Sequence, residues 1–199
     1  MSRVTTGRRR MSAAQRREQI LDVTRSIVLD EGFHEVTPGR IAAGAGVDRS
    51  LVYQQFGDLA GLFVALIDRE ITIAGEGFAA AVAAAADQPE RPTFDTVFDG
   101  VLAAIDENPS AWRLFLSPPQ GAPPELHARL AESTKLVRGF LQDELERLNP
   151  DLEDPELTAL ALHAAGSELL HQHVVNPTAV TADRLRAFIP AATARRSGR

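Results

Sequence analysis

Residues 37–56, TPGRIAAGAGVDRSLVYQQF, decide the fold of this chain, because their pattern predicts two short helices joined by a tight turn. Thr37 can cap a helix with its hydroxyl, and Pro38 suits the first helical position, where no backbone N–H is needed. Gly46 can adopt the left-handed conformation that ends this helix, and Asp48 can cap the next one. The stretch therefore predicts a helix-turn-helix.

The turn is expected at residues 44–47, and the helix after it separates its side chains by character. The side chains expected to face inward are Val47, Leu51 or Val52, and Phe56. Those left to face outward are Arg49, Ser50, Tyr53, Gln54 and Gln55. In a helix-turn-helix the second helix lies in the major groove of DNA, where Arg and Gln can read guanine and adenine. The outward residues thus indicate DNA recognition.

Residues 15–70 resemble the DNA-binding domain of the TetR family of transcriptional regulators. The shared features are the preceding helix RREQILDVTRSIVLDEGF at residues 16–33, the Thr37-Pro38 start, the AGV turn at residues 45–47, the pair Tyr53 and Phe56, and a fourth helix opening at Asp58. Two positions depart from the family pattern. Leu59 stands where a lysine that contacts phosphate is common, and Leu51 stands where a small or hydroxyl residue is common.

The expected DNA contacts fall into two groups. Arg49, Gln54 and Gln55 are predicted to reach base edges, whereas Thr37, Arg40 and Tyr53 are predicted to contact phosphates. Ser50 lies on the same outward face, and Leu51 either touches a thymine methyl group or packs inward.

Charge is distributed unevenly along the chain. Residues 1–56 carry nine arginines and six acidic groups, a net charge of +3. Because the whole chain has a net charge of −6, residues 57–199 have a net charge of −9. We expect residues 1–11 to form a flexible basic arm, in which Arg8, Arg9 and Arg10 can follow phosphates or enter a minor groove. A merely solvated basic tail is the alternative interpretation.

Composition narrows the class of protein. The chain has 199 residues, 44% of them hydrophobic, and no cysteine, which excludes disulfides and thiolate metal sites. No apolar run approaches the roughly 20 residues that a membrane helix needs, and the N-terminus lacks a signal-peptide core. The expectation is a cytoplasmic protein with no membrane partner.

Helical periodicity between proline and glycine breaks predicts an all-α fold of about nine helices. Ser12 and Gln15 have the spacing of a capping box at the first helix, and the alanine-rich residues 79–86 end a long fourth helix. Later helices are expected at residues 92–107, from 109, at 125–148, at 155–173 and at 182–193, with Asn108, Asp154 and Thr181 as caps.

These elements predict two domains. Residues 12–57 would form the helix-turn-helix domain, and residues 58–195 a larger helical domain, followed by a frayed tail at 196–199. The resemblance implies that the larger domain binds a small molecule and forms a homodimer through its last two helices. The expected interface residues are Leu157, Ala161, Ala164, Leu169, Leu185 and Phe188. An internal helix of a monomer is the alternative for residues 155–173.

Aromatic residues are the candidates for the lining of a ligand pocket. They lie on the helices that enclose a ligand in the resembled family: Phe78, Phe94, Phe98, Trp112, Phe115 and Phe140. Aromatic residues at helical spacing also occur as plain core, so both interpretations stay open.

No motif indicates a metal, a cofactor or catalysis. His163, His171 and His173 do not form a metal site by spacing, because positions i and i+2 face different sides of a helix. The chain has no phosphate-binding glycine loop, no HExxH and no GxSxG, so no enzyme is predicted.

The sequence thus predicts a homodimeric repressor that a small apolar or amphipathic molecule releases from a palindromic DNA operator. Two alternatives use the same residues. The chain could be a ligand-binding or protein-interaction module that keeps the helix-turn-helix as a scaffold, or it could be a transcriptional activator.

Overall fold

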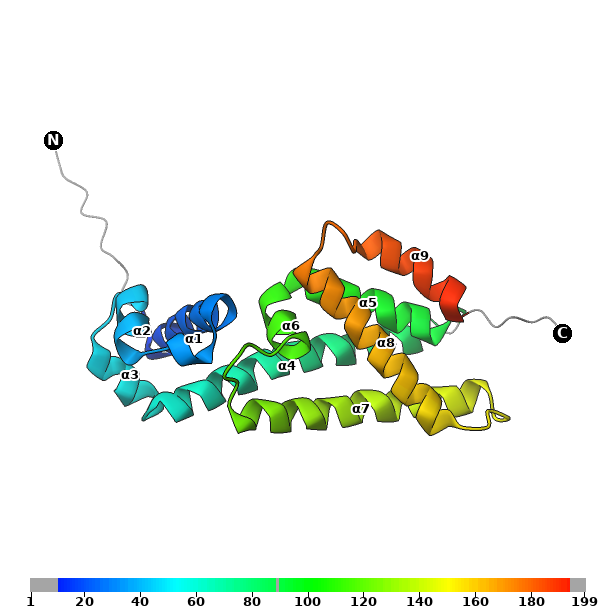
Figure 1. Ribbon diagram of the computed structural model, residues 1–199, viewed down its shortest axis with the longest axis horizontal. Coiled ribbons are helices and arrows are strands. Elements are labelled where there is room, and N and C mark those ends of the chain that lie inside the picture. Colours follow the sequence, from blue (N-terminus) through cyan, green and yellow to red (C-terminus); the bar gives the residue numbers. More distant parts are fainter. Residues whose placement is uncertain (1–10, 89, 194–199) are drawn as a thin grey trace. The chain divides into compact units, whose positions relative to one another are not determined.

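The computed structural model describes residues 11–88 and 90–193, which form nine α-helices, one 3-10 turn and no strand. This confirms the all-α prediction. The elements are α1 (Ala13–Glu31), η1 (Phe33–Glu35), α2 (Pro38–Ala45), α3 (Arg49–Phe56), α4 (Leu59–Ala86), α5 (Thr93–Glu107), α6 (Pro109–Leu116), α7 (Pro124–Leu148), α8 (Pro155–Val175) and α9 (Ala182–Thr193) (Figure 1). They divide into two compact units, Met1–Leu66 and Ile67–Arg199.

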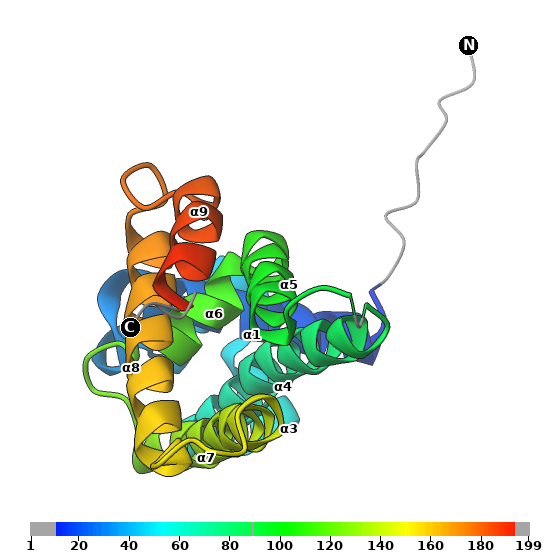
Figure 2. The same ribbon diagram turned by 90° about the vertical axis from the view of Figure 1, so that its right-hand side faces the viewer.

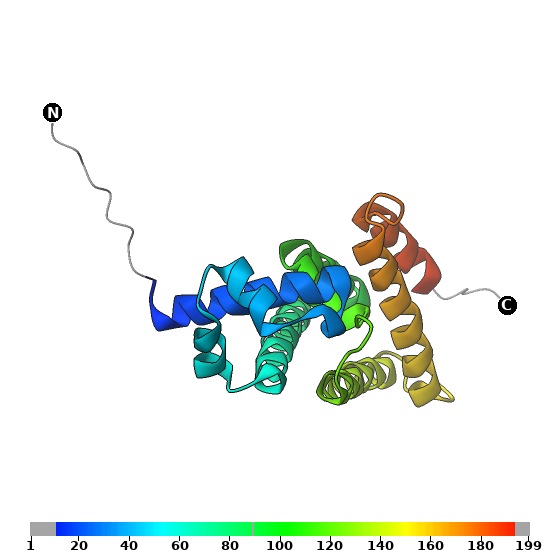
Figure 3. The ribbon, with the colours of Figure 1, turned by 60° about the vertical axis from the view of Figure 1, so that its left-hand side comes forward.

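The N-terminal unit is built from α1, α2, α3 and the first turns of α4 (Figure 3). Its apolar core consists of side chains that are almost completely buried: Ile20, Leu21, Val28, Phe33, Ile41, Val52, Leu62 and Leu66. Phe33 and Phe63 meet edge to face at 5.1 Å. Because Leu62 and Leu66 belong to this core, the division falls inside α4, whereas the sequence placed a domain boundary at the start of that helix.

Short-range capping fixes where the first helices begin and end. The Ser12 hydroxyl accepts a hydrogen bond from the Gln15 backbone, and the Gln15 side chain accepts one from the Ser12 backbone, which is the predicted capping box. Thr37 and Asp48 cap α2 and α3 as expected, and Gly46 ends α2 in the left-handed conformation, with φ 60° and ψ 41°. These predicted boundaries are confirmed.

Gly44 has a different role from the predicted one. It lies inside α2, not in the turn, and α2 packs against α1 at this position. A Cβ atom added to Gly44 would lie 2.7 Å from Cγ1 of Val23. The residue is therefore small because two helices approach closely there.

The C-terminal unit combines the rest of α4 with α5 to α9 (Figure 2). Within it α7 packs against α8, α6 against α8, and α9 against α5. The alanines of α4 allow a close approach of α5, since a Cβ on Gly100 would lie 2.6 Å from Cβ of Ala81. Helix starts again follow the sequence, except that the Asn108 side chain makes no capping hydrogen bond at α6.

No single helix in the described part of the chain is both long and apolar enough to span a membrane. Among the described helices, α3 and α4 taken together pass the same test of length and composition, as a pair bent by 65°.

Candidate DNA-reading helix and ligand cavity

Helix α3 is anchored by one side chain and exposes most of the others. Val52 is only 3% exposed and fixes the inner face of the helix. Of the two residues that the sequence offered for this inward position, Leu51 and Val52, it is therefore Val52 that is buried. Arg49, Ser50, Tyr53 and Gln54 are exposed, whereas Leu51 and Gln55 are half-buried. The helix therefore presents a polar face to solvent.

Arg49 and Tyr53 form a pair on this face. The Arg49 guanidinium donates a hydrogen bond of 3.2 Å to the Tyr53 hydroxyl and lies 5.7 Å from the centre of its ring. The two side chains are one turn apart on α3, so they occupy the same stretch of the exposed surface.

The start of α3 is held by a charged cap. The Asp48 carboxylate accepts a hydrogen bond of 2.8 Å from the Ser50 backbone N–H. Hydrogen bonds from the Ser50 hydroxyl and backbone hold the pKa of Asp48 below its usual value. Asp48 is therefore ionised at neutral pH, and the Ser50 hydroxyl is already engaged within the helix.

Arg17 holds the end of α3. Its guanidinium donates a hydrogen bond of 2.9 Å to the Gln55 carbonyl and lies 4.3 Å from the centre of the Phe56 ring. Arg17 and Arg16 are both part of α1 and not of the N-terminal arm. Sequence reasoning missed this contact, because nothing local to Arg17 points to a partner 38 residues away.

Arg40, a predicted phosphate contact, is exposed but already pairs with carboxylates of the same protein. Its guanidinium pairs with the Glu31 carboxylate and, at 3.3 Å, with that of Glu35. The hydrogen bond between Arg40 and Glu31 lowers the pKa of Glu31 and raises that of Arg40. A phosphate would have to compete with these two carboxylates. Arg8, Arg9 and Arg10 lie outside the described residues.

A cavity of about 710 Å³ lies in the C-terminal unit between α4, α5, α6, α7, α8 and α9. All six aromatic residues predicted for a pocket line it: Phe78, Phe94, Phe98, Trp112, Phe115 and Phe140. Phe78 and Phe140 meet edge to face at 5.6 Å, and Trp112 and Phe115 do so at 5.8 Å. The rings thus form much of an apolar wall.

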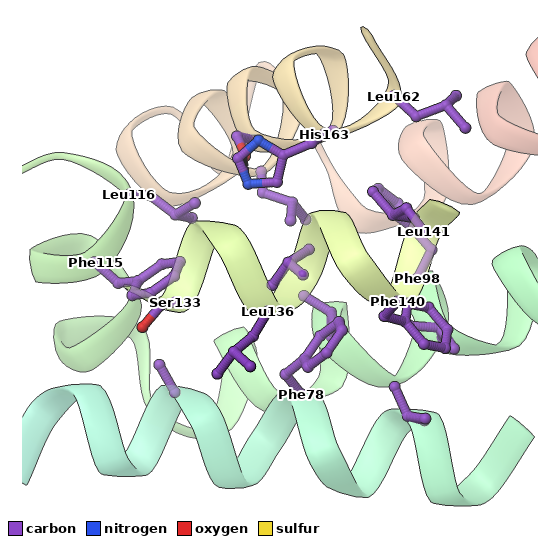
Figure 4. A pocket seen from close by; sticks show the side chains of 18 of the residues that line it. Phe78, Phe98, Phe115, Leu116, Ser133, Leu136, Phe140, Leu141, Leu162 and His163 are labelled. Atoms are coloured by element: carbon purple, nitrogen blue, oxygen red, sulfur yellow. Dashed lines mark hydrogen bonds between the residues drawn. The ribbon is translucent and has the colours of Figure 1, made fainter. Parts of the chain in front are cut away.

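Few polar side chains reach this cavity. Among the described lining residues they are Ser133 on α7, the indole N–H of Trp112 on α6, and the pair His163 and Ser167 on α8, whose Nε2 and Oγ atoms are 3.5 Å apart. Figure 4 shows the His163 ring pointing from α8 toward α7. Burial, and secondarily the positive charge of Arg138, hold the pKa of His163 below its usual value, so the imidazole is neutral at neutral pH.

The sequence did not assign His163 or Leu136 to the pocket. Leu136 lines the cavity although its side chain is 73% exposed, which places it at an opening to solvent. The spacing of His163, Gly166, Ser167 and Leu170 at three and four residues was the available signal, because such residues share one face of a helix. Which face would border a cavity depends on packing.

The predicted interface residues are not all on an open surface. Leu157 is 60% exposed, and Ala161 and Ala164 are exposed on α8. Leu185, by contrast, is 3% exposed, because α9 packs against α5. Leu185 is therefore unavailable to a second subunit without rearrangement. Leu169 and Phe188 line the cavity, although Phe188 also remains 52% exposed.

His163 and His173 on α8 have separate surroundings. The Nδ1 atom of His173 lies 2.7 Å from the Val180 carbonyl, and its Nε2 atom lies 3.5 Å from the Asp106 carboxylate. His163 faces the cavity. In the described part of the chain no three His, Cys, Asp or Glu residues are grouped in a way that could hold a metal ion.

Comparison with known proteins gives a consistent assignment. The family model for bacterial regulatory proteins of the tetR family matches residues 20–66, which include α2 and α3. A curated relative, the HTH-type transcriptional activator FasR of Mycolicibacterium smegmatis, is 24% identical over 138 residues. This similarity covers 69% of the chain but only 62% of the relative's length.

Solved structures share the fold over most of the chain. A TetR-like transcriptional regulator from Rhodococcus sp. RHA1 is 24% identical, with a TM-score of 0.70 that covers 94% of this chain and 100% of that one. NalD, the secondary repressor of the MexAB-OprM multidrug efflux pump in Pseudomonas aeruginosa, is 16% identical, with a TM-score of 0.67 over 91% and 95% of the two chains. Residues 20–66 thus match the tetR family of bacterial regulatory proteins, and the solved structures share the all-α fold of the chain around that segment.

Proposed function

We propose that this TetR-family regulator binds a palindromic DNA operator as a homodimer and represses transcription until a small apolar or amphipathic molecule enters its cavity. The observation that carries the proposal is α3, a helix anchored by Val52 that exposes Arg49, Tyr53 and Gln54. These side chains supply the donors and acceptors with which a recognition helix reads base edges in the major groove. The cytoplasm is the expected location, because the operator lies there.

The proposed DNA contacts differ in how exposed their side chains are. Arg49 and Gln54 are proposed for bases, and Thr37 and Tyr53 for phosphates, because all four are exposed. Gln55 and Leu51 are half-buried, so they would contribute at the margin of the interface. DNA contacts remain predictions for Ser50, for Arg40 and for the arm residues Arg8, Arg9 and Arg10.

A second subunit is proposed to cover α8. This helix carries apolar side chains on more than one face, and a helix that is apolar all round is normally buried. One face of α8 lines the cavity, whereas Leu157, Leu160 and Val175 remain exposed. A dimer formed there would place two reading helices on a two-fold axis, which matches a palindromic operator.

Helix α4 is proposed to transmit the effect of the ligand. It contributes Leu62 and Leu66 to the core of the N-terminal unit and Phe78 to the wall of the cavity. A ligand that favours one position of α4 would change the separation of the two reading helices. It can lower operator affinity only by its differential affinity for the two states.

Two alternatives keep specific support. FasR is an activator and NalD a repressor, so an activator that uses the same DNA contacts is the first alternative. A scaffold module without specific DNA binding is the second alternative, because Leu59 replaces the lysine that the family pattern has after the cap of the fourth helix.

A mobility-shift titration tests the proposal. Purified protein is titrated against DNA flanking its own gene, with nonspecific competitor and a salt series, and sedimentation gives the subunits per site. We expect a shift that survives competitor, two subunits per site, and affinity that falls as salt rises. Weak binding that is equal on all sequences, there and in selection from random DNA, would favour the scaffold module.

A further inference from the structure

We propose that the effector is an uncharged amphiphile, with an apolar body and a hydroxyl or phenol head group that hydrogen-bonds to His163 and Ser167. This inference rests on the proposed function, because it takes the cavity of the C-terminal unit as the effector site. It adds the chemical class of the effector and the place of its polar group.

The lining of the cavity disfavours charged ligands. Among the described residues that line it there is no Asp, Glu, Lys or Arg. An ionised group that leaves water for an apolar site without a partner loses far more free energy than a neutral polar group does. An ammonium head group would therefore bind poorly, and a carboxylate would have only the charge of Arg138, which is not a lining residue, to offset its lost hydration, whereas a hydroxyl would lose little.

The polar side chains are not spread evenly over the lining. Figure 4 shows Ser133 beside Phe115 at one end of the lining, Phe98, Phe140 and Leu141 at the other end, and His163 between them on the α8 side. Ser167 lies with His163, since its hydroxyl is 3.5 Å from Nε2 of His163. A ligand that fills the cavity therefore meets polar partners where His163 and Ser167 lie and apolar side chains along most of the remaining wall.

The state of His163 specifies the head group further. Its lowered pKa leaves a neutral imidazole, which has one donor and one acceptor nitrogen. The Ser167 hydroxyl can likewise donate and accept. A hydroxyl head group matches both partners, because it also donates and accepts. An ionised carboxylate can only accept hydrogen bonds, and an ammonium group can only donate them.

The size of the cavity suits such a molecule. Ligand pockets for drug-sized molecules have volumes of about 300 to 1,000 Å³, and this cavity of about 710 Å³ lies within that range. The aromatic walls formed by Phe78, Phe140, Trp112 and Phe115 provide the apolar contact area.

Three probes with the same tail test the inference: 1-decanol, decanoate and decylammonium. Trp112 is the only tryptophan of the chain and lines the cavity, so its fluorescence reports occupancy, and calorimetry gives the dissociation constants. We expect decanol to bind at least about tenfold more tightly than either ion. His163→Phe and Ser167→Ala should each weaken decanol binding about three- to tenfold and leave decanoate unchanged. His127→Ala, an exposed position outside the lining, is the matched control.

Each other outcome has a distinct meaning. Equal or tighter binding of decanoate or decylammonium would overturn the uncharged head group but leave the cavity as the effector site. Decanol binding that is insensitive to both α8 variants would overturn the placement at His163 and Ser167. If no probe binds, the inference and the effector site both fail, whereas operator binding is decided separately by the mobility-shift titration.

Discussion

Arg49 is the exposed cation of α3 that is best placed for a base edge. If it contacts a guanine, Arg49→Ala should weaken operator binding by about 1–3 kcal/mol and relax the preference at one base pair. Titration of single-position operator variants measures this. Arg25→Ala also removes one positive charge from the N-terminal unit, but its guanidinium pairs with Asp22 on α1, so it serves as the control. An equal loss on every variant would reassign Arg49 to the DNA backbone.

We interpret Arg17 as a residue that holds α3 in place for DNA binding and does not itself contact DNA. Arg17→Ala removes a charged hydrogen bond to the Gln55 carbonyl and the contact with the Phe56 ring. We expect a loss of about 2 kcal/mol in the free energy of unfolding, with weaker operator binding. Urea unfolding measures the first effect. Arg16→Ala, the neighbouring charge on α1, is the control. Weaker binding with unchanged stability would instead indicate a direct phosphate contact by Arg17.

His163 is expected to make the free energy of unfolding fall as the pH falls. Its folded-state pKa is lowered, so below the unfolded-state value the unfolded chain binds the proton more readily than the folded protein does. Its contribution is therefore present above about pH 6.5 and is lost as pH falls from there toward the folded-state pKa. Urea midpoints between about pH 7 and about pH 5 should fall less in His163→Phe than in the wild type. In His127→Ala the urea midpoint should change with pH as it does in the wild type. If the midpoint of His163→Phe also changes with pH as in the wild type, the lowered pKa of His163 is contradicted.

At the scale of elements, we expect residue 44 to be glycine because α1 and α2 pack closely at that position. Gly44→Ala would place a Cβ 2.7 Å from Val23, so we expect it to lower the free energy of unfolding by about 1–3 kcal/mol. Val23→Ala in the same chain should recover part of that loss. Gly39→Ala is the matched control in α2, because nothing lies within 4 Å of the added Cβ. Thermal unfolding of the wild type, Gly44→Ala, Val23→Ala, the double variant and Gly39→Ala measures these effects, and additive losses in the double variant would exclude this contact as the cause.

At the scale of the whole molecule, operator and effector must influence one another equally. If an effector lowers operator affinity by some factor, saturating operator must lower effector affinity by the same factor. Trp112 fluorescence measures effector binding with and without operator, and mobility shifts measure the converse. We expect equal factors of about 5 to 150. A factor of one would contradict a link between cavity and reading helix.

Helix boundaries were determined by the sequence itself. Ser12, Thr37, Gly46 and Asp48 act on backbone groups within about four residues, so their effects can be predicted from neighbours alone. The exposed face of α3 follows the same local periodicity. The aromatic candidates for the pocket lie on the predicted helices, but the sequence could not exclude that they form a solid core.

Only tertiary structure decided the remaining features, because each depends on groups that are distant in sequence. Arg17 meets α3 across 38 residues, and Gly44 approaches Val23 on a neighbouring helix. Leu185 becomes buried through the packing of α9 on α5. The cavity likewise requires six helices to leave space between their apolar faces. Hydrophobic periodicity shows which face of a helix is apolar, but packing alone determines whether that face meets another helix, an open cavity or a second subunit.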